Sequence, residues 1–193
     1  MGGKDWAVVD MDARDGFSLP DKKYNIIYAD PPWSYRNFQG RGKAYGDVSA
    51  HYPTMSLDEM KQMPVSDIAD KNSALLMWAT YPNLKEALEL MEAWGFDYRT
   101  VAFTWVKTRG KGFYSGLGFY TNSNAEICLL GIKGKMKRDK KNVKQLVIAE
   151  LREHSRKPDE VRDRIVDLFG DKPRIELFAR ECAENWDCWG EEV

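Results

Sequence analysis

One apolar run in the sequence ends in two prolines, Tyr24-Asn25-Ile26-Ile27-Tyr28-Ala29-Asp30-Pro31-Pro32-Trp33. The run has no helical period, and proline cannot donate a ladder hydrogen bond, so we predict a buried strand that stops at Ala29. Open α/β sheets place their ligand crevices at the carboxyl ends of their strands. We therefore expect Asp30 and Trp33 to lie at such an edge, although a merely rigid turn is the alternative.

These residue types suit the methylation of an exocyclic amine such as N6 of adenine. The lone pair of that nitrogen is delocalised into the ring until acceptors on its two hydrogens draw it toward tetrahedral geometry. The Asp30 carboxylate and the Pro31 carbonyl would supply two acceptors in fixed positions, and Pro32 would stiffen the pair. Trp33 would stack on a base that has left its helix.

The rest of the chain alternates apolar runs with helical patterns. We predict further strands at 74–80, 98–106, 127–133, 146–150 and 174–178. Helices are predicted to begin at the capping box of Ser56, to follow Pro82, and to begin at Pro158 and end at Gly170. The tail 185–191 is expected to fold back over the crevice. Strands that alternate with helices predict an α/β fold with a mostly parallel sheet flanked by helices, in a single domain over residues 1–193.

Composition limits the classes of protein. The chain has 193 residues, of which 43% are hydrophobic and 31% charged, with a net charge of −1. Nucleic-acid binding would therefore depend on local patches. No run of 18 apolar residues and no apolar signal core occur, which predicts a cytoplasmic protein without membrane contact. Cys128, Cys182 and Cys188 show no CxxC spacing and are expected to be reduced thiols, and only two histidines leave no metal site to predict.

Two glycine-rich segments, at about 34–55 and 107–121, carry interleaved basic and aromatic residues without periodicity. Such segments beside a site are more often functional than idle, and bases and phosphates are their natural contacts. The first is expected to be a mobile lid. The candidate substrate-binding residues of the two segments and their borders are Tyr35, Tyr52, Lys107 and Asn122.

A third segment, residues 133–144, contains seven Lys or Arg residues opposed only by Asp139. A charge run is usually a solvated face. In a chain of nearly zero net charge, however, this run is the leading candidate for a track that binds phosphates, with an affinity that falls as salt rises.

Five short motifs follow one another from Asp30 onward. They are Asp30-Pro31-Pro32-Trp33, Tyr52-Pro53-Thr54-Met55-Ser56, Trp105-Val106-Lys107, Ser155-Arg156-Lys157-Pro158-Asp159-Glu160 and Ile175-Glu176-Leu177-Phe178-Ala179-Arg180. In this order they resemble the DPPW-type adenine-N6 methyltransferases, the family of the catalytic subunit of the eukaryotic mRNA N6-adenosine methyltransferase. The Gly-rich and Lys-rich segments between them are more similar to phage and prophage DNA adenine methylases.

The resemblance implies a Rossmann-like, S-adenosylmethionine-dependent methyltransferase in the cytoplasm of a bacterial or phage-infected cell, acting on a flipped-out adenine of DNA. Asp30 and Pro31 would hold the amine and Trp33 the base, while Tyr52 and Asn122 would lie near the target. Lys157 would meet the methionine carboxylate or help to hold the target.

Three further residues are implied in cofactor binding. Arg180 would contact the sugar or carboxylate end of the cofactor, and Asp12 would read its adenine, with Asp10 as the alternative. Glu191 stands where relatives usually carry Asn, and a carboxylate can accept both ribose hydroxyl hydrogens.

Several alternatives stay open at this stage: an RNA target, cytosine-N4 methylation, and a non-catalytic nucleic-acid-binding partner subunit. The same applies to a homodimer or a required partner. We expect a short or loose recognition sequence, read by the two glycine-rich segments.

Overall fold

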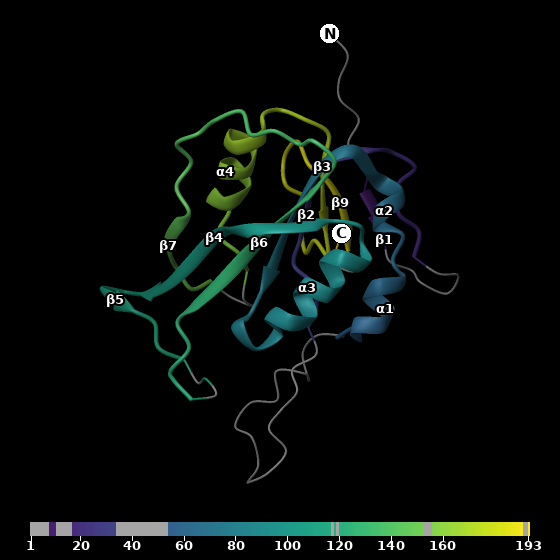
Figure 1. The fold of residues 1–193 in the computed structure, drawn as a ribbon. Helices are drawn as coiled ribbons and strands as arrows, with labels where there is room; N and C mark the ends of the chain where they lie inside the picture. The colour runs from purple at the N-terminus through teal and green to yellow at the C-terminus, as the bar shows by residue number, and fades with distance from the viewer. Residues whose placement is uncertain are drawn as a thin grey trace.

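The computed structural model describes residues 17–33, 54–116, 118, 120–152, 156–190 and 193, together with the backbone of 8–10. Within these ranges nine strands form one sheet, in the order β1-β9-β8-β2-β3-β6-β4-β5 with β7 also paired to β4 (Figure 1). The strands are β1 (Val8–Asp10), β2 (Tyr24–Ala29), β3 (Ala69–Ala79), β4 (Asp97–Arg109), β5 (Gly112–Phe113), β6 (Ala125–Lys133), β7 (Leu146–Glu150), β8 (Arg174–Leu177) and β9 (Asp187–Gly190).

The sheet is mixed, whereas a mostly parallel one was predicted. β1, β9, β8, β2 and β3 pair in parallel, as do β4 and β7. β6 lies antiparallel between β3 and β4, and the short β5 is antiparallel to β4. Because β6 runs against its neighbours, its first residues lie at the same edge of the sheet as the ends of β2, β3 and β4.

Helices cover both faces of the sheet (Figure 1). They are α1 (Leu57–Gln62), α2 (Val65–Ile68), α3 (Leu84–Ala93) and α4 (Glu160–Phe169), and a 3₁₀ turn η2 (Tyr81–Asn83) precedes α3. Met60, Leu90 and Met91 pack with one face of β2 and β3, and Val161 and Ile165 pack with the other. The result is a sheet with a buried apolar layer on each side, as the continuous apolar strands predicted. None of the described helices is long and apolar enough to cross a bilayer.

Local signals fix several ends. Ser56 and Glu59 form the predicted capping box, in which each side chain is hydrogen-bonded to the backbone of the other residue. Gly170, at φ +82°, ends α4 as predicted, whereas α4 begins at Glu160, two residues after Pro158. The strand predicted at 98–106 continues to Arg109 because β7 and β5 pair with its last residues.

Two expectations about the C-terminal region are wrong. Residues 187–190 do not fold over the crevice but form β9, which pairs with β8 and β1 and is buried. Cys182 and Cys188 are not reduced thiols but are joined by a disulfide, with Cα atoms 5.5 Å apart. β9 places Cys188 beside the segment that follows β8, a proximity that the spacing of the two cysteines does not reveal. Cys128 is free and buried, and burial raises its pKa.

Candidate active site

Four charged residues from distant parts of the chain meet at the carboxyl edge of the sheet. Asp30 directly follows β2, and Lys107 lies near the end of β4. Glu126 is the second residue of the reversed strand β6, where it is paired with Trp105. Lys157 lies just before α4. The direction of β6 explains why Glu126 joins the ends of the parallel strands.

The four side chains form a row of alternating charges, in the order Asp30, Lys157, Glu126 and Lys107. The Lys157 Nζ lies 2.8 Å from the Asp30 Oδ2 and 3.3 Å from the Glu126 Oε2. The Lys107 Nζ lies 2.5 Å from the Glu126 Oε1. Three of the side chains are only 11–12% exposed, whereas that of Asp30 is 27% exposed and so is the one most open to a ligand.

The pKa values of the cluster follow from these contacts. Burial by itself disfavours the Lys157 cation, but the carboxylates of Asp30 and Glu126 outweigh it and raise the pKa of Lys157 well above its ordinary value. Burial also disfavours the Glu126 carboxylate, yet Lys157 and Lys107 hold the pKa of Glu126 below its usual range. Both groups are therefore charged near pH 7, and two positive charges lie against two negative ones.

The two prolines form a tight turn directly after Asp30. The Trp33 N–H donates to the Pro31 carbonyl at 2.8 Å, which makes a three-residue turn centred on Pro32. The Met55 N–H donates to the Pro32 carbonyl at 3.2 Å. The Pro31 oxygen keeps a second lone pair, and the Asp30 Oδ1 accepts no hydrogen bond from any residue that the structure describes. The two acceptors thus belong to adjacent residues at the start of one rigid turn.

Trp33 anchors this turn. Its ring is only 7% exposed and packs in the core on the side of α1 and α3, and its Nε1–H donates to the Trp78 carbonyl at 3.1 Å. Its contact with a base stays a prediction. The indole of Trp78 points the other way, donates to the Tyr28 hydroxyl at 2.5 Å, and lies 5.7 Å from the Lys157 Nζ.

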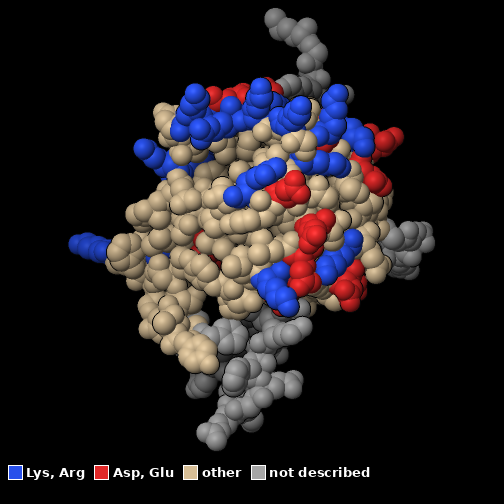
Figure 2. All heavy atoms as spheres, viewed as in Figure 1, with Lys and Arg blue, Asp and Glu red and all other residues tan. Residues whose placement is uncertain are grey.

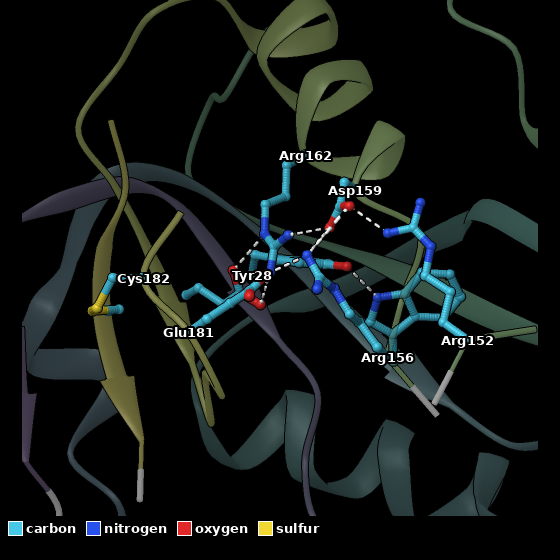
Figure 3. Close-up of polar contacts among 10 residues, drawn as sticks. Tyr28, Arg152, Arg156, Asp159, Arg162, Glu181 and Cys182 are labelled. Atoms are coloured by element: carbon cyan, nitrogen blue, oxygen red, sulfur yellow. Dashed lines mark hydrogen bonds and ion pairs between the residues drawn. A yellow bond between two sulfur atoms is a disulfide. The ribbon is translucent and has the colours of Figure 1, made fainter. Parts of the chain in front are cut away.

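A set of arginines holds the segment that carries Lys157 (Figure 3). Asp159 accepts hydrogen bonds from Arg162 at 2.9 Å, from Arg156 at 3.2 Å, and from Arg152. Arg156 also pairs with Glu181 at 2.5 Å, beyond the end of β8. Because Asp159 is two residues from Lys157, these contacts fix the backbone from which the lysine reaches Asp30.

Arg162 ties the start of α4 to the sheet. Its guanidinium donates to both oxygens of Glu176, at 2.7 and 3.0 Å. Glu176 lies on β8 and is only 7% exposed, so this two-point ion pair is almost dry. The buried hydroxyl of Tyr28 lies nearby, and burial, with the Glu176 carboxylate adding to it, raises the pKa of Tyr28.

The structure brings together part of the predicted set. Asp30, Lys107 and Lys157 meet in one cluster. Arg180 lies at the same edge, three residues after β8, and is exposed; Asn122 is exposed in the segment that connects β5 and β6. Asp12, Tyr35, Tyr52 and Glu191 lie outside the described residues, and of Asp10 only the backbone in β1 is described.

Sequence reasoning missed two residues of this edge. Glu126 directly precedes the strand predicted at 127–133, and no local pattern in the sequence marks it as a residue of the site. Asn124 holds the base of the glycine-rich segment, since its side-chain amide donates to the Tyr114 carbonyl and, at 3.3 Å, to that of Lys107. No group of three metal-ligating side chains occurs in the ranges that the structure describes.

Comparison with known proteins gives this edge a context. The model of the MT-A70 family matches residues 24–192, which is most of the chain. The chain belongs to the MT-A70 family. Proteins of the MT-A70 family use S-adenosylmethionine as methyl donor, and the chain is a methyltransferase.

Relatives fall into two groups. The type II methyltransferase M.MunI of Mycoplasma sp is 38% identical over 191 residues, which cover 91% of this chain and 80% of that protein. The MT-A70-like N(6)-adenosine-methyltransferase of Arabidopsis thaliana is 30% identical over 81% of this chain, and the human N(6)-adenosine-methyltransferase catalytic subunit METTL3 is 28% identical over 89%. The chain spans only 22% and 28% of those two eukaryotic proteins.

Proposed function

We propose that this MT-A70 protein transfers a methyl group from S-adenosylmethionine to N6 of an adenine in DNA. The observation that carries the proposal is the tight turn at the end of β2, which holds the adjacent residues Asp30 and Pro31 at the carboxyl edge, where the Asp30 carboxylate is paired with Lys157. The resemblance to M.MunI over nearly the full length of the chain favours DNA as the target.

The two acceptors act on the hydrogens of the target amine. Asp30 takes one N–H through Oδ1 and the Pro31 carbonyl takes the other, which frees the nitrogen lone pair for attack in line with the methyl group. When bound, S-adenosylmethionine would supply that methyl group, whose bond to sulfur breaks as the bond to nitrogen forms, and a neutral thioether would leave. The nitrogen sheds a proton after transfer, and Asp30 is the adjacent acceptor.

Lys157 has two tasks in this scheme. Its ion pair with Asp30 fixes which carboxylate oxygen faces the substrate. Its second task, which rests on the family resemblance, is to meet the carboxylate of the cofactor. We further propose that Arg180, Asp12 and Glu191 complete the cofactor site and that Lys107 and Asn122, with Tyr35 and Tyr52, complete the target site. The chain would act as a single domain, in a homodimer or with a partner subunit.

The test is the variant Asp30→Asn, which keeps shape and one acceptor but removes the charge. Transfer of labelled methyl groups into duplex DNA should fall by about 100-fold or more, comparable to the loss of one oxyanion-hole donor. Calorimetry should still detect S-adenosylmethionine binding. Asp97→Asn, at an exposed position of β4, is the matched control and should leave transfer unchanged.

Product analysis decides the alternatives. Mass spectrometry of digested DNA should find N6-methyladenine. N4-methylcytosine as the product, or preferred methylation of an RNA oligonucleotide of the same sequence, would refute the proposed target. Near-normal turnover of Asp30→Asn would refute the role of the turn.

A further inference from the structure

The lysine-rich segment gathers a large positive charge in an otherwise acidic chain. Residues 133–144 carry seven positive charges and one negative charge, a net of +6, so the remaining residues carry −7 of the total of −1. We call this surface the basic rim. Its cations are Lys133, Lys135, Lys137, Arg138, Lys140, Lys141 and Lys144.

The basic rim begins at the edge of the sheet opposite the candidate active site. β6 reaches from Glu126, in the charge cluster, to Lys133, which is paired with Ser73 near the start of the apolar part of β3. Seven residues of strand separate the two, which corresponds to about 24 Å. Figure 2 shows Lys and Arg side chains gathered along the upper edge of the molecule, where β6 ends, away from the lower edge to which β2 leads in Figure 1.

The backbone of the rim is held in place. The Lys135 N–H donates to the Asn72 Oδ1 at 2.7 Å, and the Asp139 N–H donates to the Leu168 carbonyl at the end of α4, also at 2.7 Å. Arg164, on α4, donates to the Lys144 carbonyl at 2.9 Å. The cations are therefore presented on an ordered support, so little backbone entropy is lost when an anion binds.

Most of these cations have no counter-charge. Lys140 pairs with Asp167, and Asp139 is taken by Lys172. Lys137, Arg138, Lys141 and Lys144 are exposed and form no ion pair with any residue in the described ranges. Like charges held this close repel one another, so the arrangement costs stability unless a polyanion neutralises it.

We propose that the basic rim is a second, sequence-independent binding surface for the phosphate backbone of duplex DNA, separate from the contact that delivers the target base. The inference rests on the proposed function in taking DNA as the macromolecule that the chain meets. An acidic protein fits less well, because protein interfaces need apolar anchors. The rim has two apolar side chains, Met136 and Val143, and both pack against the core.

The distance between the rim and the candidate active site determines which DNA can contact both. A duplex held at the site must extend at least about 24 Å, or about seven base pairs, beyond the target to reach the rim, so only a longer duplex or a second segment of DNA can engage both. Binding through phosphates alone lets a protein slide and hop along DNA. The rim would thus keep the enzyme on DNA between targets.

The experiment compares two double variants with equal changes in charge. The rim variant is Lys137→Gln/Lys141→Gln, and the control is Lys85→Gln/Arg99→Gln, at exposed positions outside the rim. Binding is measured by fluorescence anisotropy with a 40-base-pair duplex made only of G·C pairs. Because this duplex contains no adenine, the assay measures binding that does not involve the target base. The salt dependence of log K should lose about 2 units of slope in the rim variant, about 0.9 for each phosphate contact, and affinity at low salt should fall at least tenfold. The control should match the unsubstituted protein.

An unchanged slope in the rim variant, or an equal loss in the control, would overturn the proposal. The proposal would also be overturned if poly-glutamate displaced the labelled duplex as effectively as unlabelled DNA of equal total charge, since the rim would then bind an acidic protein. Methyl transfer to a short, saturating duplex should stay within twofold in the rim variant. If the unsubstituted protein transfers no methyl group yet shows the expected slopes, the proposed function fails and the rim stands.

Discussion

Replacing Glu126 with glutamine should destabilise the protein strongly. The change keeps shape and one acceptor but removes the carboxylate that separates Lys107 from Lys157. At 3.3 Å and an effective dielectric constant of about 20, the attraction between Glu126 and Lys157 alone is about 5 kcal/mol. Part of this lost attraction is offset because burying the neutral amide of glutamine costs less free energy than burying a carboxylate. Removing one partner of a buried pair costs about 3 kcal/mol, which lowers Tm by about 6–12 °C in a chain of this size.

The assay is urea unfolding followed by circular dichroism, and the chain offers a close control. Glu89 also lies between two lysines, Lys61 at 3.0 Å and Lys85 at 3.9 Å, but its side chain is 42% exposed. Glu89→Gln should leave the urea midpoint unchanged within error, because solvent screens surface pairs. Equal midpoints for the two variants would show that the cluster at the carboxyl edge is no more than a surface ion pair, and the reasoning would be refuted.

Three other contacts can be tested by pH or by substitution. Folding lowers the pKa of Glu126, so its contribution to stability is fully present above its unfolded pKa of about 4.5 and is lost as the pH falls through the folded value. The difference in unfolding free energy between the parent and Glu126→Gln should therefore be constant from pH 6 to 8 and shrink only below about pH 4.5. Trp33→Phe removes the donor to the buried Trp78 carbonyl and should cost about 2 kcal/mol in urea unfolding, whereas an unchanged midpoint would show that the indole N–H does not hold the turn. Reducing the disulfide between Cys182 and Cys188, which are six residues apart, should cost about 2 kcal/mol by loop entropy, and Cys182→Ser should show the same loss without reductant.

Much of the fold could be predicted from the sequence. The continuous apolar runs of β2, β3 and β6 and the spacing of Leu84, Ala87 and Met91 in α3 specify elements that bury their own side chains, so local pattern was sufficient. The reversed direction of β6 could not be read in this way, because a strand buried on both faces looks the same in either direction. β9 was missed for a related reason: Cys188 and Trp189 become core residues only through pairing with β8 and β1.

The site shows the same division. Asp30 was identifiable because two prolines mark its position, and Lys157 because it belongs to one of the motifs that carry the family resemblance. Glu126 carries no such local mark, and its role depends on the reversed strand that sets it against Lys157. The placement of the basic rim at the far edge also depends on that strand, so residues 133–144 could be read as a phosphate track without any indication of their distance from Asp30.

The ion pair between Asp30 and Lys157 joins residues that are 127 positions apart. At about 5–20 residues per second, a ribosome needs about 6–25 s to make the intervening polypeptide. During that time the nascent chain already contains the Asp-Pro-Pro-Trp turn but lacks the lysine that orients its carboxylate. We expect the orientation of the Asp30 carboxylate to be completed only late in synthesis, after the segment that carries Lys157 has been made.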